Sequence, residues 1–193
     1  MVKKPHMRRL LPFGLLLILA APLLAAGEAR IRDLAATEQN GRISVGFRLE
    51  GAFARPEILR AIESGLPTVL AYEVELVRKR PNWFDDLVAR SRIEVVATYN
   101  SVTREYLLNY RRDRKLVSSE ILTSLEELQR RMSSIREADL FGTEGRKPWK
   151  LRVRVRAELS RRYLWDLVPW DVATDWEETR VESAAARAQG AAR

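Results

Sequence analysis

An alternation of apolar and basic residues in the C-terminal third of the chain constrains the fold most. In the stretch Lys147–Leu159, every second residue from Leu151 onward is apolar. The residues between them include three arginines, Arg152, Arg154 and Arg156. Successive side chains of a β-strand point to opposite faces. The stretch therefore predicts a central antiparallel strand with one face in the hydrophobic core and a basic outer face.

Two pairs of alternating segments predict β-hairpins. The first pair flanks Asn40-Gly41, a dipeptide that tolerates the positive φ angles of a tight hairpin turn. The second pair flanks Asn100–Thr103. A further alternating segment, Thr68–Arg78, predicts a strand whose outer face is acidic because it carries Glu73 and Glu75. The hairpin strands are expected at residues 29–37, 43–50, 92–99 and 104–111.

Two short amphipathic helices are expected beside these strands. Pro56 suits a first helical position and Gly65 a stop, which predicts a helix over residues 56–64. Thr123, followed three residues later by Glu126, has the spacing of a capping box. The second helix is therefore expected to start between residues 119 and 123 and to end near Ser133. Its apolar face would contain Leu122, Leu125, Leu128 and Met132.

These elements predict a mainly β fold: a β-sandwich-like antiparallel sheet of about six or seven strands, with the two helices packed on it. A single β-rich domain is expected at residues 29–178. The Ala-rich, charged segment 179–193 is expected to be a disordered tail. Residues 83–89 fit either one helical turn or an aromatic loop, and residues 163–176 are expected to form a loop and an edge strand over the sheet.

The N-terminus has the pattern of an export signal. Four basic residues precede an apolar run at residues 10–24, which ends in Ala25, Ala26 and Gly27. We expect a signal peptide at residues 1–26 and a periplasmic location. The alternative is an uncleaved membrane anchor, because the apolar run is of marginal length for roughly 30 Å of hydrocarbon. The chain has 34 basic and 26 acidic residues, a net charge of +8. Without the four basic residues of the signal, 30 basic residues remain and the net charge is +4.

The absence of two residue types limits the chemistry of the exported form. The chain has no Cys, and its one His, His6, lies in the predicted signal. Disulfides, thiol nucleophiles, imidazole bases and Cys or His zinc sites are thereby excluded. We expect no cofactor, no metal and no enzymatic activity. Nucleic acid is not an expected partner, since export would separate the protein from it.

The basic face of the central strand suggests one binding surface. Same-face residues of a strand lie roughly 6.6 Å apart, so the fields of Arg152, Arg154 and Arg156 would add. Such a row of arginines fits an anionic envelope lipid or glycan. The alternative is a solvated ionic face, in which outward glutamates of neighbouring strands pair with the arginines.

Aromatic and acidic residues supply further candidates. Trp83, Trp165 and Trp170 fit a protein contact surface, although tryptophans also cap hydrophobic cores and stack on sugars. A glycoside hydrolase would need two carboxyl groups at a defined separation, one with a raised pKa. Asp residues in loops are usually turn formers. The candidate carboxylates are Asp85, Asp86, Asp166, Asp171 and Asp175.

Several segments together resemble the bacterial domain of unknown function 4390 family over roughly residues 30–176. The most specific are Ser64-Gly65-Leu66-Pro67, Tyr72–Leu76, Trp83 with Asp85, Tyr99–Tyr106 and the late Asp175-Trp176. The resemblance implies an exported proteobacterial protein without assigned activity, so it implies no catalytic residues. Genes of this family often lie beside a membrane sensor histidine kinase, which suggests an extracytoplasmic partner of such a kinase.

The sequence therefore predicts a non-catalytic interaction or regulatory module of the cell envelope. Its expected partner is an envelope or membrane protein, with a sensor kinase as the specific hypothesis. The alternative function is binding of an anionic lipid or glycan through Arg152, Arg154 and Arg156. A carboxylate-based hydrolase is the third hypothesis.

Overall fold

The computed structural model describes residues 28–80, 84–160 and 172–184. These residues form ten strands, two α-helices and two short 3-10 turns. In chain order the elements are β1 (Arg30–Gln39), β2 (Arg42–Glu50), η1 (Ala52–Ala54), α1 (Pro56–Glu63), β3 (Thr68–Arg78), β4 (Asp86–Asn100), β5 (Glu105–Arg112), β6 (Lys115–Leu122), α2 (Leu125–Ser133), β7 (Ser134–Gly142), η2 (Pro148–Lys150), β8 (Leu151–Ser160), β9 (Val172–Ala173) and β10 (Glu177–Ser183).

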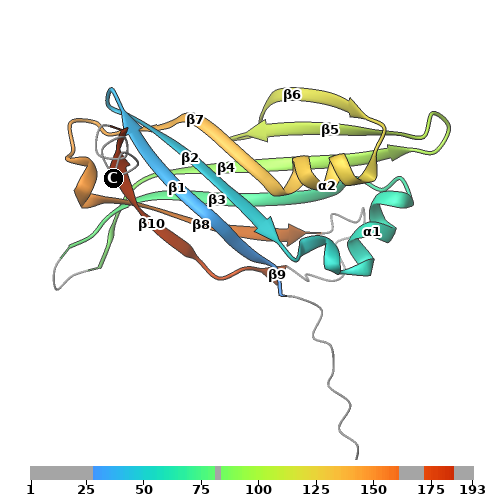
Figure 1. Ribbon diagram of the computed structural model, residues 1–193, viewed down its shortest axis with the longest axis horizontal. Helices are drawn as coiled ribbons and strands as arrows, with labels where there is room; N and C mark the ends of the chain where they lie inside the picture. The colour runs from blue at the N-terminus through green and yellow to red at the C-terminus, as the bar shows by residue number, and fades with distance from the viewer. Residues whose placement is uncertain (1–27, 81–83, 161–171, 185–193) are drawn as a thin grey trace, which may run out of the picture.

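All ten strands belong to one curled sheet, a half-barrel (Figure 1). Nine of them follow one another in the order β6-β5-β4-β3-β8-β10-β1-β2-β7, and β9 pairs with β8. Neighbours are antiparallel except β1 and β10, which are parallel, with Ala36 beside Val181. The sheet is therefore mixed, with β8 at the centre of the strand order.

Contacts across the interior show how far the sheet curls. The rings of Phe47 on β2 and Tyr72 on β3 meet edge to face at 5.2 Å, although these strands are four steps apart in the sheet. Side chains join β7, at one end of the strand order, to β5, the strand next to the other end. The Tyr110 hydroxyl and the Arg112 guanidinium donate to Glu137 at 2.5 Å and 2.7 Å. The two edges of the sheet thus approach each other without pairing.

The expected central strand is confirmed as β8, and its apolar side chains are buried in the core. The predicted acidic face of β3 is present, but the prediction that it is an outer, exposed face is wrong. The side chain of Glu73 is nearly buried and Glu75 is fully buried. Arginines of β4 and β8 lie over these carboxylates from both sides, so both faces of β3 are covered.

Both predicted hairpins and the first helix are confirmed. Asn40 and Gly41 have φ angles of 53° and 77°, as a tight turn between β1 and β2 requires. Helix α1 begins at Pro56, and Gly65 follows its end with a φ of 77°. A Cβ at Gly65 would lie 3.2 Å from the carbonyl oxygen of Tyr99. Glycine is therefore needed there both for its φ and for the close approach of the β4 backbone.

The second helix begins later than expected. Its N-cap is Ser124, whose hydroxyl accepts from the backbone N–H of Glu127 at 3.4 Å, so the predicted cap lies one residue too early. Leu122 belongs to strand β6 and not to the helix. Leu128 and Met132 are buried as expected, and the Tyr72 hydroxyl donates to the Met132 carbonyl at 2.7 Å. Helix α2 is thereby fixed against the concave face of the sheet.

The sandwich expectation is not confirmed, and strand β10 gives the physical reason. Residues 177–180 pair with β8 and residues 181–183 pair with β1. This strand joins the β1-β2-β7 group to the remaining strands, so one curled sheet replaces two stacked sheets. Residues 179–183 belong to this strand, so the disordered tail expected at these residues is wrong. Residues 86–89 belong to β4, so neither the helical turn nor the loop expected there extends to them.

Candidate functional site

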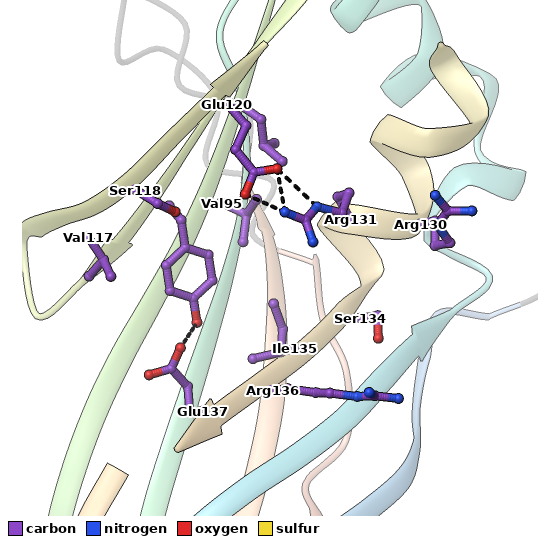
Figure 2. Close-up of a pocket in the computed structure, with 12 residues that line it drawn as sticks. Val95, Val117, Ser118, Glu120, Arg130, Arg131, Ser134, Ile135, Arg136 and Glu137 are labelled. Carbon is purple, nitrogen blue, oxygen red and sulfur yellow. Dashed lines mark hydrogen bonds and ion pairs between the residues drawn. The ribbon is translucent and has the colours of Figure 1, made fainter. Parts of the chain in front are cut away.

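A cleft of about 430 Å³ lies where the half-barrel fails to close, between β6 on one side and α2 with β7 on the other (Figure 2). Its buried apolar lining comes from three strands and consists of Val95, Leu108 and Ile135, with Tyr110 beside them. Val117, Ser118 and Glu120 of β6 form one wall. The opposite wall consists of Arg130, Arg131, Ser134, Arg136 and Glu137.

Two polar bridges cross the cleft. At one end, Tyr110 and Arg112 of β5 hold Glu137 of β7. Burial, and then the hydrogen bond to Glu137, raise the pKa of the Tyr110 hydroxyl, so it remains a donor. At the other end, Arg131 of α2 binds Glu120 of β6, with Nε 3.1 Å from Oε2 (Figure 2). The hydrogen bond from Arg131 lowers the pKa of Glu120, which keeps this carboxylate charged.

Both strands beside the cleft are edge strands. Within the described residues, β6 has only β5 as a strand neighbour and β7 has only β2. One side of each strand therefore presents backbone N–H and C=O groups without a ladder partner. Natural proteins usually protect such edges with charges, prolines, bulges or a covering element. β6 has one bulge opposite Tyr110 and Arg111, but its central residues, Leu116–Ser119, carry no charge.

The hairpin β5–β6 also exposes apolar side chains. Ile121 is 67% exposed and faces Leu107, also exposed, across the hairpin. Leu116 and Val117 are exposed on the same edge strand. Apolar side chains that cluster on an unpaired edge are typical of an interaction surface. We call Leu107, Leu116, Val117 and Ile121 the β6 edge patch.

One end of this patch is basic. Arg111, Arg114 and Lys115 surround the β5–β6 turn, and all three are exposed. None of them has an ion-pair partner in the described part of the chain. Asp113 in the same turn accepts hydrogen bonds from the backbone N–H of Arg92 and from the Ser91 hydroxyl. The turn therefore offers unpaired positive charge to a partner.

The arginine row on β8 is engaged within the protein. Arg154 Nε lies 2.6 Å from Glu75 Oε2, and Arg156 Nε lies 2.8 Å from Glu73 Oε2. Arg152 pairs with Glu178 at 3.3 Å. The Trp176 ring lies under both Arg154 and Arg156, with guanidinium carbons 4.7 Å and 4.8 Å from its centroid. The anion-site hypothesis stays a prediction, and any anion would compete with these carboxylates.

The other candidate residues are only partly placed. Trp83, Trp165 and Trp170 lie outside the described residues, as do Asp166 and Asp171. Asp85 pairs with Lys79 at 2.8 Å, and Asp86 binds Arg78 and Arg80. The hydrogen bond from Arg78 lowers the pKa of Asp86, whereas a general acid needs a raised one. In the described ranges, no group of three or more acidic or histidine side chains is arranged to hold a metal ion.

A family model matches residues 26–179, which is most of the chain. The chain belongs to the DUF4390 family. This family is described as a domain of unknown function, and the match confirms the resemblance seen in the sequence. No curated protein and no solved structure matches the chain.

The match to the DUF4390 family includes the cleft and the central strands but ends within β10. No helix in the described ranges is long and apolar enough to cross a membrane. The residue patterns predict neither β6 nor β7, and therefore they do not predict the cleft between them. Bulges in the β5–β6 and β2–β7 pairings interrupt the alternation that marks a strand.

Proposed function

We propose that this DUF4390 protein is a non-catalytic interaction module that binds an extended segment of a partner protein along β6. The observation that supports this most is the unpaired β6 edge beside a cleft with an apolar lining. A partner strand added to β6 would pair its backbone with the edge. Its alternate side chains would then point into the cleft and over the β6 edge patch.

The charge distribution indicates the chemistry of the partner. Arg111, Arg114 and Lys115 lie unpaired at one end of β6, so acidic residues at that end of the partner segment would be favoured. The apolar lining of the cleft favours apolar residues at every second position of the partner segment. The bridge between Glu120 and Arg131 fixes the far end of the cleft.

Envelope location and the sensor-kinase partner remain part of this proposal, since they rest on the sequence and the resemblance alone. The alternative, an anionic lipid or glycan bound by Arg152, Arg154 and Arg156, has less structural support. Its arginines already contact Glu178, Glu75 and Glu73 in that order. A ligand would have to displace three carboxylates, two of which are buried, whereas the β6 edge is open.

In-cell photo-cross-linking from position 117 tests the proposal. The expected adduct joins Val117 to one contiguous partner segment in which apolar residues alternate. Ile121→Lys places a charge in the β6 edge patch and should abolish the adduct. Val102→Lys is the matched control, because Val102 is also apolar and exposed but lies in the β4–β5 turn.

The backbone pairing is tested separately by hydrogen exchange. In the purified complex, those amides of residues 115–122 that do not bond to β5 should exchange more slowly than in the free protein, because a partner strand would occupy them. Adducts that survive Ile121→Lys, or unchanged exchange of these amides in the complex, would contradict strand addition at β6.

A further inference from the structure

A second exposed surface, independent of the β6 edge, lies at the end of β3 that is far from α1. Figure 1 shows this end of the strand opposite the helix. Arg78, the last residue of β3, is paired with Asp86 on β4 and with Leu151 on β8. Phe84 lies two residues before Asp86, and Trp149 lies two residues before Leu151. Because both neighbouring strands run antiparallel to β3, Phe84 and Trp149 both lie beyond the C-terminal end of β3.

The apolar side chains at this end are unusually accessible. Phe84 is 88% exposed, Trp149 is 67% exposed, and Leu87 is about half exposed. Neighbouring strands lie about 4.8 Å apart, so the first residues of β4 and β8, which flank the end of β3, are separated by roughly 10 Å. Three large apolar side chains are thus exposed near the same end of β3, although solvent exposure costs each of them free energy.

The positive charge next to these residues is not fully balanced. Lys79 and Arg80 are neutralised by Asp85 and Asp86. In contrast, Lys147 lies with its Nζ 5.2 Å from the centroid of the Trp149 ring, and it has no ion pair in the described part of the chain. Lys150 is likewise exposed without an ion pair among the described residues.

Exposed aromatic rings flanked by lysines are typical of a surface that sits at the boundary between lipid and water. Aromatic rings prefer the head-group region of a bilayer, and lysine extends its stem along apolar groups while its ammonium reaches phosphate. Anionic lipids also attract each lysine near the surface. We propose that this end of the sheet docks onto an anionic bilayer, with Phe84 and Trp149 among the head groups and Lys147 and Lys150 on the lipid phosphates.

The absence of cysteine from the chain permits a direct test. The full chain carrying Phe84→Cys is labelled with the environment-sensitive fluorophore NBD and mixed with vesicles of equal parts phosphatidylcholine and phosphatidylglycerol. The expected result is a blue-shifted, stronger NBD emission, because the label enters an apolar environment. Vesicles of phosphatidylcholine alone should give little change, and added salt should reverse the effect.

The position of the label is decisive, since the apolar run at residues 10–24 can itself attach the chain to vesicles. Val102→Cys labelled in the same way is the control, because Val102 is 89% exposed at the opposite end of β4. Its emission should stay unchanged. Replacing Lys147 and Lys150 by Gln should raise the lipid concentration for half-maximal signal about 25-fold, from about five-fold per lysine. An unchanged Phe84→Cys label, or equal changes at both positions, would overturn the proposal.

Discussion

Glu75 provides the sharpest test of how the convex face of the sheet is stabilised. Its carboxylate is fully buried on β3 and lies between two guanidinium groups. Arg90 Nε donates to Oε1 at 2.8 Å, and Arg154 Nε donates to Oε2 at 2.6 Å. Glu75→Gln keeps the volume of the side chain but removes its charge and leaves the two arginines facing a neutral amide.

The expected loss in the free energy of unfolding depends on two facts: the Glu75 carboxylate is buried, and its two arginine partners are partly exposed. Removing one partner of a buried ion pair costs about 3–5 kcal/mol when the remaining charge stays buried. Here the side chains of Arg90 and Arg154 are 55% and 33% exposed, so water can solvate the guanidinium groups that remain. We therefore expect a loss of about 2–3 kcal/mol. For a domain of this size, the corresponding fall in Tm is about 4–12 °C.

The measurement is urea unfolding and thermal unfolding followed by circular dichroism, with Glu178→Gln as the control. Glu178 also bridges two cations, Lys79 and Arg152, each at 3.3 Å, but its side chain is 27% exposed. Its substitution should cost under about 1 kcal/mol. If Glu75→Gln lies within about 0.5 kcal/mol of the wild type, or equals the control, the buried carboxylate does not hold these strands together.

Three further perturbations test other parts of the fold. Tyr72→Phe leaves the Met132 carbonyl without its donor and should cost about 1–2 kcal/mol by urea unfolding, whereas Tyr106→Phe should cost under about 0.5 kcal/mol. Gly65→Ala should destabilise more than Gly145→Ala, although both glycines have positive φ, because only Gly65 has a backbone atom close to the added Cβ; equal losses would contradict this. The folded-state pKa of Glu120 lies below its ordinary value of 4.5, so the bridge to Arg131 stabilises the fold above that value. This contribution should disappear as the pH falls through the folded-state pKa, and Glu120→Gln should remove that part of the pH dependence.

The sequence predicted those elements in which alternation or turn chemistry is undisturbed. Strand β8 has an uninterrupted period of two, and the first hairpin contains a dipeptide suited to its turn, so both were found. β6 and β7 were missed because bulges shift the alternation within their pairings. The residues of β10, Glu177–Ser183, are mostly polar and show no apolar alternation, so the sequence does not mark them as a strand. They form one because they pair with β8 and β1.

The burial of Glu73 and Glu75 shows a second limit of sequence patterns. An alternating strand with charged residues indicates one polar face, but it does not show what covers that face. The arginines that lie over these carboxylates come from β4 and β8, which are 15 to 83 residues away along the chain. The pairing of these glutamates with arginines corresponds to the ionic face that the sequence suggests as the alternative to an anion site. The sequence pattern does not show that β3 lies between two strands that carry arginines, β4 and β8.

The position of the cleft follows from the connectivity of the chain. β10 ties the two groups of strands together, which leaves β6 and β7 as the ends of one curled sheet. These two strands are consecutive except for α2, and strands that pair as a hairpin need a tight turn between them. The chain instead places a nine-residue helix there, held inward by Leu128, Met132 and the hydrogen bond from Tyr72. The two edges approach each other without joining, so the edge of β6 stays open, and an added strand is the element that would complete the ladder there.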